Sequence, residues 1–195
     1  MAAAPSLRRA AVAVLLLNLT YFGVEFGTAL AIGSVALFAD SIDFLEDASI
    51  NLLIAVAVGW SARRRANLGY VLALMLLVPG LATLVMAWLK LGAPLAPDAT
   101  LLTATGAGAL VVNLDCALLL ARVKARGGSL GTAAFLSARN DVLANIAIIG
   151  AGFATAAMAS PWPDVGVGVA IGLLNAGAAR EVWQAARSER RELAP

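Results

Sequence analysis

Four acidic residues stand close together in a stretch of the chain that is otherwise apolar enough to cross a lipid bilayer. The stretch is GSVALFADSIDFLEDASINLLIAVAVGW, and the acids are Asp40, Asp43, Glu46 and Asp47. An acidic side chain at the middle of a transmembrane helix costs about 2.5–3.5 kcal/mol. Four of them in one span need a compensating role, and binding a cation inside the membrane is the simplest one.

A second polar stripe lies further along the chain, in FLSARNDVLANIAIIGAGFA. On a helix with about 100° of turn per residue, Asp43 and Asp47 lie one turn apart on the same face. Ser137, Asp141 and Asn145 follow one another at the same spacing of four residues. If the two helices touch, we expect three carboxylates and at least one neutral oxygen to converge on one point.

Such a ligand set suits a divalent metal ion. Carboxylates crowded into a poorly hydrated pocket repel one another, so we expect the empty site to hold protons that an arriving metal ion displaces. Exposing that site to each side of the membrane in turn would exchange metal for protons. The alternative is that Asp43, Asp47 and Asp141 serve structure only, for instance by pairing with Arg139. We expect Arg139 to point away from Asp141 and to reach Asp115 instead.

Other polar residues in the apolar stretches have less specific patterns. Glu25 and Asp40 are predicted near the outer ends of the first two helices, where they either line an outward vestibule or cap helix ends. Asn18 and Asn113 are predicted to make hydrogen bonds between helices. The single cysteine, Cys116, is predicted to be a small packing residue.

The elements that must position these residues are predicted to be membrane-spanning helices. The chain has 195 residues and is 61% hydrophobic, which is more apolar surface than a soluble domain of this length can bury. Segments of about 20 mainly apolar residues can each cross the hydrocarbon core. The predicted fold class is therefore all-α, a six-helix transmembrane bundle that forms one domain over residues 1–195. The six helices are predicted at residues 10–32, 35–60, 68–91, 99–121, 133–158 and 165–183.

Positive charge gathers on one side of this predicted bundle. Arginine and lysine residues cluster before the first helix and after the second, fourth and sixth helices. The positive-inside rule therefore places both the N and C termini in the cytoplasm. We expect a multi-pass integral protein of a bacterial inner (plasma) membrane. The basic clusters are scattered and lack aromatic residues between them, so we expect no binding of nucleic acid.

The sequence offers little to an enzyme. It contains no histidine, and hence no Ser–His or Cys–His pair, and it has no phosphate-binding loop of the GxxxxGK[ST] type. Two aspartates on one turn of one helix do not supply the opposed pair of an aspartic protease. We therefore expect no enzymatic activity and no cofactor. The expected partners are the lipid bilayer, protons, and a divalent metal ion as the transported substrate.

Two stretches resemble a known family. NLTYFGVEFGTALAIGSVALFADSIDFLEDASINLL resembles the first two helices of the cation diffusion facilitator family, through its Gly-Ser turn, its Ala-Asp pair and its acids spaced four apart. FLSARNDVLANIAIIGAGFA resembles the fifth helix of that family. The resemblance matches Asp43 and Asp47 to the metal ligands of helix two, and Asp141 to the aspartate of helix five. It implies a homodimeric, proton-coupled exporter of zinc, cobalt, cadmium, iron or manganese.

The chain departs from the family pattern in two places. Ser137 stands where the family often has His or Asp, so it is a weaker ligand, and either Asn140 or Asn145 could compensate. The chain also ends soon after its last predicted helix, which implies a short branch with the transmembrane domain alone and a weaker basis for dimerisation.

The sequence is compatible with two classes of metal ion and with two functions. Oxygen ligands without imidazole favour harder ions such as Mn²⁺, Mg²⁺ or Fe²⁺, whereas the family favours zinc, cobalt and cadmium. The alternative function is a membrane protein that binds metal without transporting it, or that modulates a partner transporter.

Overall fold

The computed structural model describes residues 7–56, 81–92, 94–123 and 128–192, and every regular element in those ranges is a helix. The predicted third helix, 68–91, falls partly outside the described residues. The helices are α1 (Leu7–Ile32), α2 (Val35–Val56), Leu81–Gly92, α4 (Ala99–Ala121), α5 (Gly128–Met158) and α6 (Trp162–Glu192).

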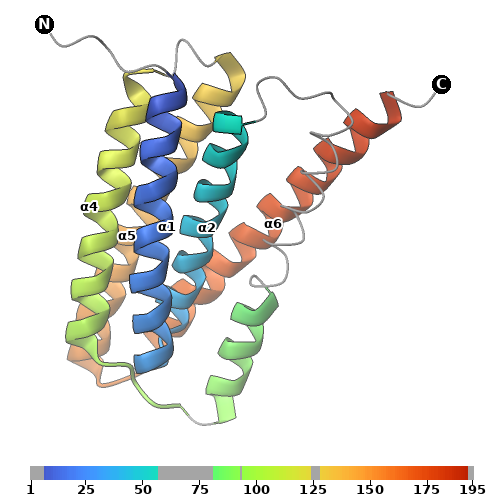
Figure 1. The fold of residues 1–195 in the computed structure, drawn as a ribbon. Coiled ribbons are helices and arrows are strands. Elements are labelled where there is room, and N and C mark those ends of the chain that lie inside the picture. Colours follow the sequence, from blue (N-terminus) through green and yellow to red (C-terminus); the bar gives the residue numbers. More distant parts are fainter. Residues whose placement is uncertain (1–6, 57–80, 93, 124–127, 193–195) are drawn as a thin grey trace, which may run out of the picture.

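Four of these helices form a closed ring. α1 packs against α2, α2 against α5, α5 against α4, and α4 against α1. Figure 1 shows the four standing side by side with their axes roughly aligned, whereas α6 crosses at an angle and leans away toward its C-terminal end. α6 contacts both α2 and α5, so α2 packs against α1, α5 and α6 and also touches α4.

The turn between α1 and α2 is tight. Gly33 has a φ of 64°, a left-handed conformation that glycine adopts without steric cost. The backbone N–H of Ser34 then donates to the carbonyl oxygen of Ala29 at 3.0 Å. This turn makes α1 and α2 antiparallel neighbours, as their separation by Gly-Ser in the sequence predicts.

Asp164, in the first turn of α6, holds the start of α2. Its buried carboxylate accepts a hydrogen bond from the hydroxyl of Ser34 at 2.5 Å. It also accepts from the backbone N–H groups of Val35 at 2.9 Å and Ala36 at 3.1 Å. The ammonium group of Lys90 lies 3.4 Å from the same carboxylate. A negative charge at a helix N-terminus is favourable, so this one side chain caps α2 and joins three segments of the chain.

Three helices begin earlier than the sequence pattern indicated, and one of them is α1, which begins at Leu7 rather than at residue 10. α6 begins at Trp162 rather than at residue 165, so Pro163 lies in its first turn. Proline is tolerated there because the first N–H groups of a helix have no partner within the helix. α5 likewise begins at Gly128 rather than at residue 133.

The outer surface of the bundle is apolar. Among the described residues, three helices are long and apolar enough to cross a membrane, namely Arg8–Ile32, Ala99–Ala121 and Ala138–Met158. α2 carries four acidic side chains and is not among them. A soluble protein rarely exposes so continuous an apolar surface, and here it suits contact with lipid. Large exposed apolar side chains include Leu16 and Val24 on α1, Val111 and Leu118 on α4, and Leu143 and Phe153 on α5.

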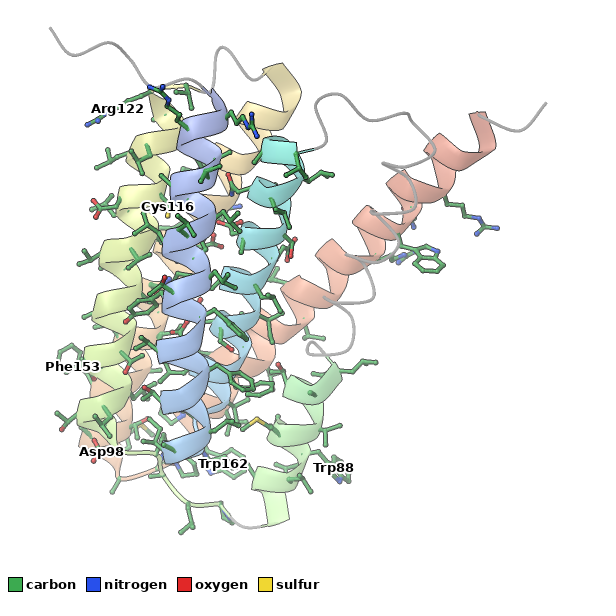
Figure 2. The ribbon with its side chains drawn as sticks, in the orientation of Figure 1. Trp88, Asp98, Cys116, Arg122, Phe153 and Trp162 are labelled. Carbon is green, nitrogen blue, oxygen red and sulfur yellow. The ribbon has the colours of Figure 1, made fainter. Side chains whose placement is uncertain are left out.

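The two ends of the bundle differ in chemistry. Trp88 and Trp162 lie at one end and Arg122 lies at the opposite end (Figure 2). Trp88 is 73% exposed. Tryptophan is enriched where membranes meet water, and arginine at the cytoplasmic side. α1 begins at the end that carries Arg122 (Figures 1 and 2), which agrees with the charge pattern of the sequence.

Candidate cation site

The acids of α2 lie along the part of that helix that meets its neighbours. Asp40 is fully buried and Asp47 is 3% exposed, while Asp43 and Glu46 are half-buried. Asp40, Asp43 and Asp47 follow one another at helical spacing, so they form a row along α2. Carboxylates at such positions are largely removed from water. Their attraction to a cation is stronger there than it would be in water.

Asp141 on α5 approaches this acidic row. α5 packs against α2, and Asp141 is half-buried. The carboxylates of Asp47 and Asp43 are near enough to that of Asp141 for their charges to interact. The structure therefore places acids from two helices, distant in sequence, within electrostatic reach of one another.

The acids do not converge on a single point. Among the residues that the structure describes, no three Asp, Glu or Cys side chains lie close enough to hold one ion together. Like charges repel, so closer approach of Asp43, Asp47 and Asp141 requires a positive charge between them. The arrangement is an open cluster that an ion would have to draw together.

Two asparagines extend this cluster in the same way. Asn145 donates its side-chain N–H to the backbone oxygen of Asp141 at 2.6 Å, and Asn51 donates to that of Asp47 at 2.8 Å. Both side chains are buried, and their Oδ1 atoms accept no hydrogen bond from the described residues. Each acid thus has a neutral oxygen one helical turn further on. The sequence analysis missed Asn51, although its spacing of four from Asp47 was a visible signal.

The residues around Asp141 have different positions on α5. Asn140 is exposed and accepts a hydrogen bond from Nη2 of Arg139 at 3.4 Å. Asn145 is fully buried. The structure thus favours Asn145 over Asn140 as an interior oxygen. Ser137 lies on α5 one turn before Asp141, and its side chain is outside the described part of the structure.

Two predicted contacts near this cluster have opposite outcomes. The expected pairing of Arg139 with Asp115 is wrong, because among the described residues Arg139 bonds to Asn140 and makes no ion pair. The prediction that Asn18 joins two helices is confirmed, because the thiol of Cys116 on α4 donates to Oδ1 of Asn18 on α1 at 3.5 Å.

Glu25 and Asp40 form a separate pair between α1 and α2. Both side chains are 0% exposed, so they do not line an open vestibule, and neither caps a helix end. Their carboxyl groups lie within hydrogen-bond reach of each other. Neither of the two expected roles, lining an outward vestibule or capping a helix end, fits this position, because the packing of α1 on α2 encloses both side chains.

The comparison with family models decides the class of the protein. The chain matches the cation efflux transmembrane domain over residues 11–189, which is nearly its whole length. The chain belongs to the cation efflux family. The resemblance to cation diffusion facilitators, and with it the all-α membrane fold, is confirmed. A search of curated proteins finds no match.

Membership of the cation efflux family relates the buried acids to the transport of metal cations. Cation efflux proteins are transporters that move metal cations across membranes, so this chain is an integral membrane protein of a metal-transporting class. Asp43, Asp47 and Asp141 all lie within the matched range, on the two helices whose sequences carry the resemblance. These two helices, α2 and α5, pack against each other in the structure.

Proposed function

We propose that this protein exports divalent metal ions from the cytoplasm in exchange for protons. The observation that carries the proposal is the packing of α2 against α5, which sets Asp141 against the acidic row of Asp43 and Asp47. Membership of a family of metal cation transporters supports it. The apolar surface around these acids supports passage of an ion within the bundle rather than along its outside.

In this proposal Asp43, Asp47 and Asp141 bind metal and protons alternately. A divalent ion neutralises most of the charge of three carboxylates, and protons do so when the metal has left. Asn145 and Asn51 contribute neutral oxygens, and Ser137 contributes a weak one. Zinc, cobalt and cadmium are the first candidates by family, and Mn²⁺ or Fe²⁺ follow from a ligand set made of oxygen alone.

The proposed orientation places both termini in the cytoplasm. The basic end of the bundle near Arg122, opposite Trp88 and Trp162, supports this orientation (Figure 2). We further propose that residues 1–195 act as one transmembrane domain, in a bacterial inner membrane. Homodimerisation is carried over from the family resemblance alone.

The experiment is metal flux in proteoliposomes. Purified protein is reconstituted with a proton gradient directed against metal movement, and Zn²⁺, Co²⁺, Cd²⁺, Mn²⁺ and Fe²⁺ are compared. Loss of a residue that supports a metal ligand typically costs about 10–100-fold in metal affinity or activity. Asp47→Asn and Asp141→Asn remove proposed ligands themselves, so each should lower flux by more than that. The matched control is Asp115→Asn, an exposed acid on α4 outside the cluster, which should keep wild-type flux.

The same preparation separates transport from binding alone. Metal binding without flux in any ion gradient would reject the exporter and favour a non-transporting protein that binds metal or modulates a partner. Flux that does not respond to the proton gradient would reject proton exchange while keeping export.

A further inference from the structure

The carboxyl groups of Glu25 and Asp40 are enclosed, and no described residue donates a hydrogen bond to them. Both side chains are 0% exposed. None of their four oxygens receives a hydrogen bond within the part of the chain that the structure describes. The two groups lie within reach of each other, but a carboxylate is an acceptor only, so neither can bond to the other unless a proton is present.

The described residues around the pair supply no compensating positive charge. The phenol of Tyr21, one turn before Glu25 on α1, lies near both acids, but its hydroxyl donates to the backbone oxygen of Thr105 at 2.6 Å and not to either carboxylate. Asp43 adds a further negative charge that acts on Glu25. No ion pair joins Glu25 or Asp40 to a basic side chain of the described residues. Buried charged groups without partners are strongly unfavourable.

We propose that Glu25 and Asp40 form a second cation site, which holds one small cation between its two carboxyl groups. The cation is either a proton shared by the pair or a divalent metal ion bound between the two groups. Either one places a positive charge between two buried carboxylates. The site is distinct from the proposed transport cluster, because α1 rather than α5 supplies its second acid. It stands whether or not Asp47 and Asp141 carry the exported ion.

The position of this pair connects it to the transport cluster. Asp40 precedes Asp43 by about one helical turn, or about 4.5 Å along α2, on the side of the Gly33–Ser34 turn. The charge of Asp40 also acts on Asp141. A cation held by Glu25 and Asp40 therefore offsets negative charge at the transport cluster, and its arrival should weaken binding of a second cation there.

Two measurements on the full-length protein in nanodiscs test the site. Titration with Co²⁺ alone gives the number of ions bound per chain, and infrared spectroscopy detects a protonated, buried carboxylic acid. Both are applied to the wild type, to Glu25→Gln, Asp40→Asn and the double variant, and to Asp47→Asn. Asp115→Asn, an exposed acid on α4, is the matched control.

Each result either supports or overturns the proposal. If the pair holds metal, Glu25→Gln and Asp40→Asn each remove one bound Co²⁺ that Asp47→Asn retains. If the pair holds a proton, Co²⁺ stoichiometry is unchanged, but both variants lose a protonated-carboxyl band that Asp47→Asn and Asp115→Asn keep. A wild type that shows no such band, and whose bound Co²⁺ is absent or is all lost in Asp47→Asn, overturns the site, even if the Glu25 and Asp40 variants fail to fold. Failure of the proposed transport cluster would appear separately. In that case Asp47→Asn would bind as many Co²⁺ ions per chain as the wild type does.

Discussion

Asn145 donates its side-chain amide to the backbone oxygen of Asp141 at 2.6 Å, one turn back along α5. Asn51 stands in the same relationship to Asp47 on α2, at 2.8 Å. This hydrogen bond orients each amide group, and the carbonyl oxygen Oδ1 of each is buried without a donor among the described residues. The two helices that face each other with acids therefore also present one oriented neutral oxygen each.

We predict that Asn145→Ala and Asn51→Ala weaken metal binding. Each substitution removes a neutral oxygen beside a proposed acidic ligand, and losses of this kind typically cost about 10–100-fold in metal affinity. Calorimetric titration with Co²⁺ measures the change. The matched control is Asn140→Ala, because Asn140 is exposed and bonded to Arg139, and it should bind Co²⁺ as the wild type does. A loss in Asn140→Ala equal to that in Asn145→Ala would contradict the assignment of the interior oxygen.

We predict that Asp164→Ala destabilises the bundle. The substitution removes the cap of α2 and leaves Lys90 without its carboxylate, and breaking a buried ion pair costs about 3–5 kcal/mol. Thermal unfolding in detergent measures the loss. Asp98→Ala is the control, because Asp98 caps α4 through the N–H of Leu101 at 2.9 Å but is exposed, so only about 0.5–2 kcal/mol should be lost. Equal losses in the two variants would show that the buried position of Asp164 adds nothing.

We predict that Gly168→Ala loosens the contact between α6 and α2. A Cβ atom at Gly168 would lie 2.5 Å from the carbonyl carbon of Val35 and 2.6 Å from the nitrogen of Ala36. Both are backbone atoms that cannot move aside alone, so the helices must separate, at about 1–3 kcal/mol for overpacking. Unfolding in detergent measures this. Gly166→Ala, on the same helix with nothing within 4 Å of its Cβ, should be neutral or stabilising, and destabilisation there would mean that helix spacing is not the cause.

The helices and their acids were predictable because they follow local periodicity. Asp43 and Asp47 share a face by spacing alone, and the apolar runs around them predicted transmembrane helices. What periodicity cannot give is the rotation of one helix against another. The choice between Asn140 and Asn145 depended on that rotation, and so did the enclosure of Glu25 and Asp40.

Contacts across long sequence separations were equally beyond prediction. In the sequence, Asp164 is only one acidic residue just before the last predicted helix. In the structure it caps the start of α2, which is 129 residues away from it at Val35. No local pattern marks such a partner, since any acid near a loop could have served. The packing of α6 onto α2 had to be known first.

We predict that metal binding releases protons and strengthens as pH rises. Protons and metal compete for the same carboxylates in the proposed cluster, so each displaced proton should lower affinity by up to about tenfold for each unit by which pH falls. Co²⁺ titrations at several pH values measure the affinity, and a dye in weakly buffered solution measures the protons released. Asp47→Asn and Asp141→Asn should each release fewer protons per ion, whereas Asp115→Asn should match the wild type because it lies outside the cluster. Affinity that stays constant with pH, with no proton release on binding, would leave the cluster without the exchange that we propose for it.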